Sequence, residues 1–530
     1  MIYISNLFVP ILEIDAAQYA EMSRELLSSS NWLYLYDIGT DYLDKPPFLF
    51  WISALSMKIF GIHVWSYKLP SILFAIWAIY ALYRFALLFY TKETAEVGAL
   101  IFASCQAMFL VTNDIKTDTI LLSFVITAFW QLASWLYAKN KWGWILGALA
   151  IGGALITKGP IGLLIIGFGF LPHFIIKKEW KNLFRWQYLP LLVIVALVLL
   201  PMSIGLYEQF DLQPNKRVNG GTNVSGLRFF YWTQSFGRIT GESVWNNNAG
   251  FTFLYENLLW GLIPLTLFFV AATVKGFIKL GRRSYQTEWI STSAVVLAYL
   301  SLGMSKFQLP HYIYVVLPFI CLLLARYYLS VFHFFNHKFR ILRLVHNFVF
   351  YLLAALIPIL FYIIFPELTS IDYLAFILFY LIVAYLLYAE QQAKISLLTT
   401  AVALSILINL LMNLVFYPQL MPYQKENVIV NKIETANIPK NEIAVYQLGV
   451  GRSADFLLQY DLPIIGTQDL LSYHYLITGD KGLLVLTKKG IDYKKVHQGL
   501  SFHIARLTLP FLNPATRKEA CSNYYIVQLQ

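Results

Sequence analysis

The stretch "LPSILFAIWAIYALYRFALLFY", residues 69–90, is an apolar run with a single charged residue, Arg84. A helix of about 20 apolar residues spans the hydrocarbon core of a bilayer, which is roughly 30 Å thick. Similar runs recur along the 530-residue chain, of which 58% is hydrophobic and 13% is charged. A soluble domain does not carry this composition. The sequence therefore predicts a polytopic α-helical membrane protein, because helices satisfy their own backbone hydrogen bonds in lipid.

Twelve apolar segments are predicted to form helices that cross the membrane. They cover residues 69–90, 95–112, 119–137, 143–157, 161–176, 188–206, 251–273, 289–303, 311–329, 344–365, 371–389 and 395–415. The first residues, "MIYISNLFVPILEI", are too few to cross a bilayer. Two interpretations stay open for them: a short partial helix, or the end of a longer one that begins upstream.

The basic residues predict the orientation of the chain, whose net charge is +11. They gather in short loops between alternate helices, and such loops face the cytoplasm. These loops contain Lys139 and Lys141; Lys177, Lys178, Lys181 and Arg185; Lys275, Lys279, Arg282 and Arg283; and Lys338, Arg340 and Arg343. This distribution argues against nucleic acid as a partner. Segments 15–68, 113–118, 207–250 and 304–310, and the chain after about residue 416, are expected on the opposite, outer face.

The composition changes after residue 416, where apolarity drops. We therefore predict a membrane-embedded domain over residues 1–416, with amphipathic helices in its outer loops, and a small soluble α/β domain over residues 417–530. In the latter, "IAVYQL" and "GLLVLT" are predicted strands and "SADFLLQY" a helix. The "GVGRSA" segment between them has the glycine spacing of a phosphate loop, but a plain strand-to-helix turn is favoured. Two of the three cysteines fall in apolar helices, so no disulfide is predicted.

The first outer segment carries polar groups at informative positions. "EIDAAQYAEMSRELLSSSNW" predicts an interfacial amphipathic helix that begins near Asp15. Asp15 has two interpretations, a capping box with Gln18 or a functional acid. The following "DYLDKPP" fixes the backbone with two prolines and holds Lys45 at the membrane edge. Lys45 could bind a phosphate or simply extend toward lipid headgroups.

Three further outer turns contain ionisable residues. "TNDIKTDTILL" places Asp114 and Asp118 one helical turn apart, where each is either a helix cap or a functional acid. "LITKGPIG" interrupts two apolar segments with Lys158, and an ionisable group at membrane depth indicates function. "SKFQLPHYIYVVLPF" sets Lys306, His311 and Tyr312 around Pro310. Because all these turns are expected on one face, we predict that their side chains form one site.

The segments "DAAQYAEMSREL", "DKPPFLFWISALSMKIFG", "NDIKTDTILLSF", "LITKGPIGLL" and "KFQLPHY" occur in this order. In this order they resemble the GT-C membrane glycosyltransferases that use polyprenyl-phosphate sugars. The similarity spans about residues 10–330 and is greatest to lipid A aminoarabinose transferases and dolichyl-phosphate-mannose-protein mannosyltransferases. It implies the GT-C fold with about 12–13 transmembrane helices and, in many members, a small C-terminal extracytoplasmic domain.

The resemblance also implies an activity and a location. A hexosyl or pentosyl group would move, with inversion, from a polyprenyl-phosphate donor to lipid A, another cell-envelope glycan or a protein. The expected location is a bacterial inner (cell) membrane, among membrane lipids, with the active site and C-terminal domain on the periplasmic face. A transporter or flippase of polyprenyl-phosphate-linked sugars is the alternative. Transporters usually place polar groups near the membrane midplane, whereas the ionisable residues here gather in outer loops.

Residue roles follow from the same resemblance. It makes Asp15 and Asp114 the catalytic acids, with Asp114 at the start of a helix. The residues that would bind the donor phosphate are Lys45, Lys158, Arg238 and Tyr312. Secondary candidates are Asp44, Asp118 and Lys306. No cofactor is expected; a divalent metal stays possible but disfavoured, because Ser235 stands where a histidine ligand is expected.

Overall fold

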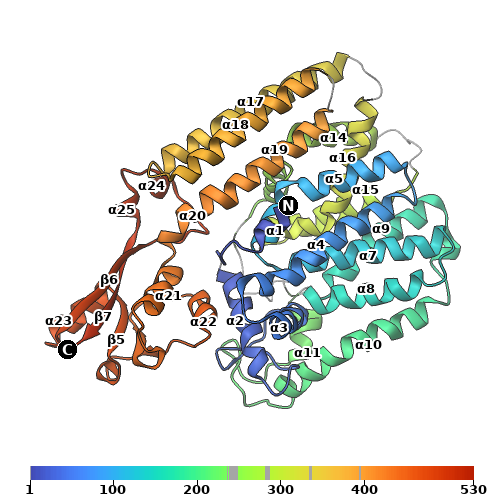
Figure 1. The fold of residues 1–530 in the computed structure, drawn as a ribbon. Helices are drawn as coiled ribbons and strands as arrows, with labels where there is room; N and C mark the ends of the chain where they lie inside the picture. The colour runs from blue at the N-terminus through green and yellow to red at the C-terminus, as the bar shows by residue number, and fades with distance from the viewer. Residues whose placement is uncertain are drawn as a thin grey trace.

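Figure 1 shows a body of long helices that run roughly side by side, with a small sheet at one end. The computed structural model describes residues 2–12, 14–234, 237, 247, 249–280, 287–332, 337–392 and 396–530. In these ranges seven helices are long and apolar enough to cross a membrane, or eight if one bent pair counts as a single span. Five shorter apolar helices accompany them. The chain is an integral membrane protein, and the predicted fold class is confirmed.

The helices of this body follow the predicted order. They are α4 Val64–Ala86, α5 Lys92–Ser104, α6 Gln106–Asn113, α7 Thr117–Tyr137, α8 Gly143–Lys158, α9 Ile161–Lys177, α10 Tyr188–Leu206, α13 Phe253–Gly261, α14 Thr266–Leu280, α15 Ile290–Gly303, α16 Leu317–Phe332, α17 His337–Ile364, α18 Ser370–Gln391 and α19 Leu397–Leu411. Helix α7 is the most enclosed of the long spans, since 78% of its most apolar window is buried. Its central place fixes the outer end of α7 relative to its neighbours.

Two predicted helices are broken in the structure. The segment 95–112 forms α5 and α6, which bend by 49° at Cys105, whose backbone is extended. The segment 251–273 forms α13 and α14 with a turn between them. Pro264 lies in that turn, and proline removes a helix hydrogen bond and restricts the residue before it. Apolarity alone did not reveal either break.

The first outer segment folds into α1 Ile2–Asn6, α2 Ile14–Ser28, the hairpin of β1 Tyr36–Asp37 and β2 Thr40–Asp41, and α3 Phe48–Phe60. Helix α2 is amphipathic as predicted, and its apolar face packs on α3 around Tyr19 and Phe50. The sequence analysis did not anticipate α3 as a separate helix. The long segment 207–250 contains short helical turns: η2 Tyr207–Asp211, α11 Gly226–Arg228 and η3 Phe229–Thr233.

The capping box proposed for α2 is wrong. The helix begins at Ile14, so Asp15 lies inside its first turn instead of preceding it. Gln18 does not turn back to the helix start but donates a hydrogen bond to Asp37 Oδ2 (2.8 Å). Asp15 is therefore left available for another role.

The C-terminal part contains a five-stranded sheet in the order β4-β3-β5-β7-β6. The strands are β3 Ile443–Tyr446, β4 Ile464–Ile465, β5 Tyr475–Gly479, β6 Tyr493–Ser501 and β7 Ser522–Leu529. Strand β3 is parallel to β4 and β5, whereas β7 is antiparallel to β5 and β6. Helices α21 Lys425–Thr435, α22 Arg452–Leu458 and α23 Asp480–Lys488 accompany the sheet. The preceding helical stretch Leu397–Tyr423 runs through residue 416, and the domain boundary there stays a prediction.

Two local predictions for this part have opposite outcomes. The predicted strand "GLLVLT" is wrong, because it lies in α23, where Leu483 and Leu486 are buried while Leu484 between them is exposed. This spacing of three is helical, and a short apolar run does not by itself distinguish helix from strand. The segment "GVGRSA" does form a strand-to-helix turn between β3 and α22, as predicted. There the Gly451 N–H donates to Glu426 Oε1 (2.9 Å).

Candidate active site

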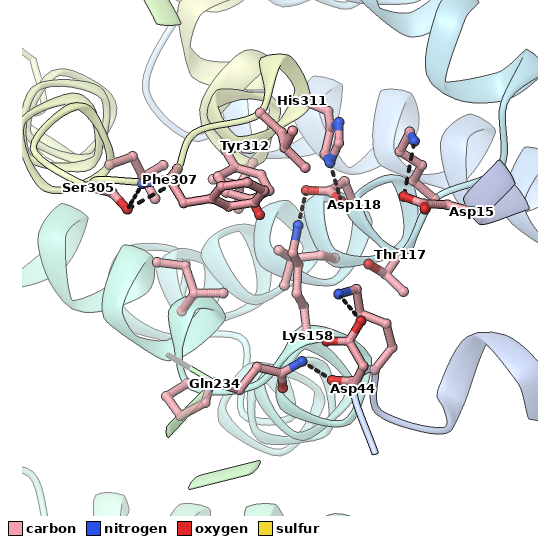
Figure 2. Close-up of a pocket in the computed structure, with 18 of the residues that line it drawn as sticks. Asp15, Asp44, Thr117, Asp118, Lys158, Gln234, Ser305, Phe307, His311 and Tyr312 are labelled. Carbon is pink, nitrogen blue, oxygen red and sulfur yellow. Dashed lines mark hydrogen bonds and ion pairs between the residues drawn. The ribbon is translucent and has the colours of Figure 1, made fainter. Parts of the chain in front are cut away.

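A cavity of about 280 Å³ opens where the segments that are predicted to lie on the outer face meet. The ends of several elements line it: the first turns of α2 and α7, the residues before α3, the turn from α8 to α9, and the segment η4 Pro310–Val316 before α16. Figure 2 shows their polar side chains pointing toward one another. Segments far apart in the sequence thus share one site.

Asp118 and Lys158 form the ion pair at the centre of this cavity. Asp118 lies in the first turn of α7 and Lys158 is the last residue of α8, so each charge faces the helix end that favours it. Lys158 Nζ lies 2.5 Å from Asp118 Oδ1, and the Asp118 side chain is only 4% exposed. Gly159, with φ of +85°, ends α8 directly after the lysine, and Pro160 precedes α9. The local sequence therefore presents Lys158 at the junction of two helices.

The η4 segment brings two more side chains to this pair. His311 Nε2 lies 3.6 Å from the second carboxylate oxygen of Asp118. The Tyr312 ring centre lies 4.6 Å from Lys158 Nζ, which is within the range of a cation–π contact. Asp118 thus organises Lys158 and His311, while Tyr312 covers the ammonium group.

The "DKPP" segment supplies the next pair. Lys45 Nζ lies 2.8 Å from Asp44 Oδ2, with the lysine side chain 19% exposed and the aspartate 45%. Pro46 and Pro47 follow immediately, and α3 begins after them. The Gln234 side chain donates a hydrogen bond to the Asp44 carbonyl. The backbone that holds Lys45 is therefore fixed by two prolines and by a contact from the long outer segment.

Lys116 links the remaining acids. Its Nζ lies 3.1 Å from Asp114 Oδ2 and 3.8 Å from Asp15 Oδ2. Lys116 and Asp15 line the cavity, whereas Asp114 is not among its lining residues. The expectation that Asp114 begins the following helix is wrong: Asp114 follows the end of α6, and α7 starts at Thr117. Asp118 is the acid at that helix start.

The cavity therefore combines paired charges with an apolar wall. Its three acids each lie within 4 Å of a lysine: Asp15 with Lys116, Asp44 with Lys45, and Asp118 with Lys158. The apolar lining consists of Leu121, Pro160, Ile161, Leu164, Leu302, Leu309 and Val315. Burial raises the pKa of the Tyr19 hydroxyl in this lining well above its usual range, so it stays protonated. Such a cavity suits an amphiphile with an anionic head group.

Six of the residues singled out from the sequence line the cavity: Asp15, Asp44, Lys45, Asp118, Lys158 and Tyr312. Lys306 is exposed and does not line it, although Ser305 and Phe307 beside it do. Arg238 and Ser235 lie outside the described residues. Sequence reasoning gave no role to Lys116, which stands between the two acids of "NDIKTD", or to His311. Within the described ranges, no group of three or more His, Cys, Asp or Glu side chains is arranged to hold a metal ion.

Known proteins resemble this chain in sequence. The family described as dolichyl-phosphate-mannose-protein mannosyltransferase matches residues 44–204. The undecaprenyl phosphate-alpha-4-amino-4-deoxy-L-arabinose arabinosyl transferase of Enterobacter sp. (strain 638) is 27% identical over 60% of this chain. A second transferase of that description, from Sodalis glossinidius (strain morsitans), is 28% identical over 60% of the chain. The match spans 56% of the length of each relative.

Solved structures share the fold over nearly the whole chain. ArnT from Cupriavidus metallidurans bound to undecaprenyl phosphate superposes with a TM-score of 0.73 at 14% identity, covering 99% of this chain and 95% of that protein. The apo state of the same protein gives a TM-score of 0.71 at 13% identity. At this identity the similarity shows the fold, including the C-terminal sheet, and the expected GT-C architecture is confirmed.

Proposed function

We propose that this chain, a member of the ArnT-like GT-C superfamily, transfers a sugar from a polyprenyl-phosphate donor to an acceptor at the outer face of the membrane. One observation carries the proposal: three lysines from separate segments converge on a single cavity that apolar side chains also line. A lipid-linked sugar phosphate has the complementary form, with an anionic group between a polar sugar and a hydrocarbon chain.

Donor binding uses both parts of the cavity. Lys45 and Lys158 bind the phosphate, and the Tyr312 hydroxyl beside Lys158 donates a further hydrogen bond to it. The first isoprene units lie against the wall formed by Ile161 and Leu164 of α9 and its neighbours. Arg238 is proposed as an additional phosphate ligand from the long outer segment, on the resemblance alone.

The reaction needs a leaving group and a nucleophile. The acceptor oxygen attacks the anomeric carbon opposite the phosphate and forms the new C–O bond, so the configuration inverts. The bond from the anomeric carbon to the phosphate oxygen breaks, and its electron pair leaves with the polyprenyl phosphate. Lys45 and Lys158 stabilise the negative charge that develops on that oxygen. The proton of the acceptor hydroxyl moves to a carboxylate.

Asp15 is the carboxylate that we assign to this proton transfer. Its side chain lines the cavity and is 54% exposed, and it pairs with Lys116 at 3.8 Å. Asp118, by contrast, is buried between Lys158 and His311, so we assign it to holding the phosphate-binding lysine. Asp114, proposed as catalytic on the resemblance, acts in this arrangement through Lys116.

The sugar, acceptor and location are the finer parts of the proposal. A pentosyl or hexosyl donor, and lipid A, another envelope glycan or a protein as acceptor, are all compatible with the cavity. The printed names of the relatives favour undecaprenyl phosphate and an arabinosyl group. We place the chain in a bacterial inner membrane, with the site on the periplasmic face. The proposal contains no metal, and Lys45, Lys158 and Tyr312 provide the positive charge and hydrogen bond that the phosphate requires.

The experiment is a transfer assay with the purified full chain in lipid vesicles. A polyprenyl-phosphate sugar, labelled in the sugar, is supplied with an extract of cell-envelope acceptors. We expect labelled product together with released polyprenyl phosphate. If the intact donor crosses the vesicle bilayer and no label is transferred, the transporter alternative holds and the proposed reaction fails. Mass spectrometry of envelope glycolipids from a deletion strain then identifies the acceptor.

A further inference from the structure

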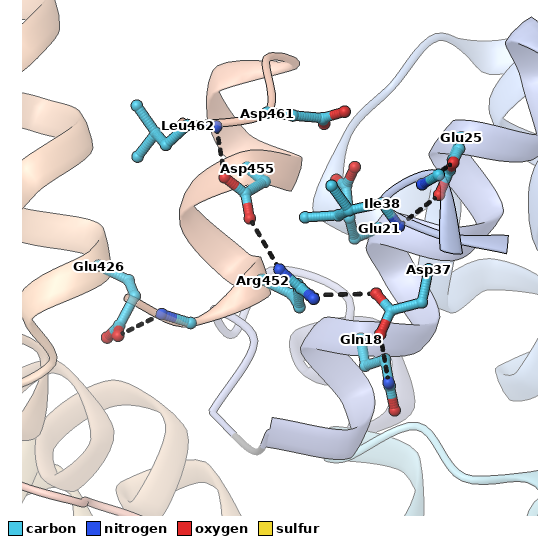
Figure 3. Close-up of polar contacts among 12 residues, drawn as sticks. Gln18, Glu21, Glu25, Asp37, Ile38, Glu426, Arg452, Asp455, Asp461 and Leu462 are labelled. Carbon is cyan, nitrogen blue, oxygen red and sulfur yellow. Dashed lines mark hydrogen bonds and ion pairs between the residues drawn. The ribbon is translucent and has the colours of Figure 1, made fainter. Parts of the chain in front are cut away.

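The C-terminal part contacts α2, the helix that carries Asp15 in its first turn (Figures 1 and 3). The side chain of Asp15 is largely exposed, so its position depends on how α2 itself is held. Helix α22 and the loop after it approach α2 from the side away from the membrane helices, as Figure 1 shows. Three separate contacts connect the two.

The first contact is a relay of hydrogen bonds. Arg452, the first residue of α22, donates from Nε to Asp37 Oδ1 at 3.1 Å. The second oxygen of Asp37 accepts a hydrogen bond from Gln18 Nε2 at 2.8 Å. The Asp37 side chain is only 16% exposed, and these two partners bind its two oxygens. Gln18 lies one helical turn after Asp15, and the relay ends there.

The second contact is an ion-pair cluster. Arg24 of α2 forms a bidentate pair with Glu21 on the same helix, and a further ion pair with Asp461 in the loop after α22. The pKa of the Glu21 carboxyl is raised to about 7, because the effect of burial is larger than the opposing effect of the hydrogen bond and charge of Arg24. Arg24 therefore forms ion pairs both within α2 and with the C-terminal part.

The third contact is apolar. Phe456 of α22 enters the buried cluster formed by α2 and α3, and its ring centre lies 6.1 Å from that of Tyr67. The Tyr67 hydroxyl donates to the carbonyl of Ala16, the residue after Asp15 (2.9 Å). The C-terminal part thus contacts the start of α2 in two ways, through the hydrogen bonds that end at Gln18 and through the packing of Phe456 near Tyr67.

We propose that Arg452 positions Asp15 for the reaction, by acting through Asp37 and Gln18 on the first turns of α2. Arg452 touches neither donor nor acceptor, and it is a positioning residue. The inference rests on the role proposed for Asp15. It gives the C-terminal part a function in catalysis: docking of α22 sets the geometry of the acid. A small misplacement is enough to matter, because about 1 Å at a reacting group can cost about a hundredfold in rate.

The test compares Arg452→Ala, Arg452→Lys and the matched control Lys440→Ala in the full chain. Lys440 Nζ binds the carbonyl of Leu458 at the end of α22, within the C-terminal part. We expect Arg452→Ala to lower kcat by about ten- to a hundredfold with the donor KM within about twofold of the parent. Arg452→Lys should recover part of kcat, and Lys440→Ala should resemble the parent. A parent-like kcat in Arg452→Ala overturns the proposal.

Two further measurements separate positioning from a loss of stability. If the relay exists, adding Arg452→Ala to Asp37→Ala has little further effect, whereas independent effects that multiply contradict it. Hydrogen–deuterium exchange in the first turns of α2 should rise in Arg452→Ala and not in Lys440→Ala. Exchange does not require activity, so it tests the relay even if the proposed transfer reaction fails. Unchanged exchange in α2 overturns the inference.

Discussion

The cavity pairs every acid that lines it with a lysine, and substitution of single residues can separate their roles. We expect Asp15→Asn to lower turnover by at least about a hundredfold, since asparagine cannot accept a proton. The donor affinity should stay near that of the parent, because the phosphate ligands that we propose, Lys45 and Lys158, are unchanged. Helix α2 should persist, since its packing on α3 is unchanged. Initial rates and donor binding, measured on the same preparation, check this prediction.

Asp118→Asn and Asp114→Asn are the comparisons. Asp118→Asn should weaken donor binding, because Lys158 and His311 lose the carboxylate that orients them. Asp114→Asn should act more weakly, through Lys116. An Asp15→Asn enzyme with nearly the parent turnover, beside an inactive Asp114→Asn enzyme with normal donor binding, would transfer the catalytic role to Asp114.

The role of Lys158 is tested with a single and a double variant, because its partner Asp118 is buried. Removing the lysine alone leaves the Asp118 carboxylate with one charge partner fewer, and breaking a buried ion pair costs about 3–5 kcal/mol. We expect Lys158→Met to lower both thermal stability and donor affinity. The double variant Lys158→Met with Asp118→Asn should recover stability without recovering affinity. Losing a charge-assisted contact corresponds to about a ten- to hundredfold weaker donor affinity.

The measurement is donor binding by titration, with thermal unfolding in parallel. Lys45→Ala is a simpler test of the same site, since its partner Asp44 is 45% exposed and water can solvate the carboxylate. Donor affinity equal to that of the parent in all three variants would remove these lysines from the phosphate site.

The sequence predicted the charged residues of the site better than their partners. Lys158 stood out because a lysine between two apolar segments is costly unless it functions. Its partner Asp118 is 40 positions away, and only the packing of α7 against α8 brings them together. Asp114 was preferred over Asp118 on the resemblance alone, because spacing along the chain does not reveal which acid faces the cavity. Lys116 was given no role, and its place in the site follows from its contacts with Asp114 and Asp15.

At the scale of elements, α23 offers a direct test of helix against strand. Leu486 is fully buried and Leu484 is 61% exposed. We therefore expect Leu486→Ala to destabilise the C-terminal part by about 2–5 kcal/mol and Leu484→Ala to have an effect within about 0.5 kcal/mol. In a strand these two residues would share a face and would have similar effects. Resistance of the C-terminal part to limited proteolysis measures the difference, and equal sensitivity of the two variants would contradict the helix.

The elements that were predicted correctly are those with long apolar runs, such as α7 and α10. Composition is sufficient there, since lipid leaves the backbone no alternative to a helix. The errors lie in segments for which two local structures, such as a helix and a strand, have similar free energies. The α13–α14 break depends on Pro264, and the run in α23 is too short to show its period. Helix α3 was missed because it follows the "DKPP" segment, whose prolines were interpreted only as a rigid mount.

At the scale of the whole molecule, the loop charges predict which side each end of the protein occupies. We expect a protease added to the outer face of sealed spheroplasts to cleave the C-terminal part after residue 430. An epitope placed in the basic loop at residues 178–187 is the control, and it should be cut only after the membrane is breached. Immunoblotting against both ends checks the result. Cleavage of the control loop in intact spheroplasts, with a protected C-terminal part, would reverse the proposed orientation.

The contact between the C-terminal part and α2 was beyond sequence reasoning. Arg452 and Asp37 are 415 positions apart, and nothing local to either residue indicates the other. The sequence does predict that both lie on the outer face, because the loop charges assign both segments to that side. The side of the membrane on which a segment lies can thus be predicted from the sequence, whereas the contact between the C-terminal part and α2 depends on tertiary structure.

The internal pairing of the cavity also determines which molecules can compete for it. Because Asp15, Asp44 and Asp118 already neutralise the three lysines, the empty site has little excess positive charge with which to draw anions from water. A small soluble phosphate must break these ion pairs without any compensating contact. A lipid-linked phosphate must break the same ion pairs, but it also buries its hydrocarbon chain against the apolar lining, which is favourable. Under the proposed function, inorganic phosphate in the surrounding medium should therefore be a poor inhibitor, and the lipid-linked donor is expected to enter the site from the plane of the bilayer.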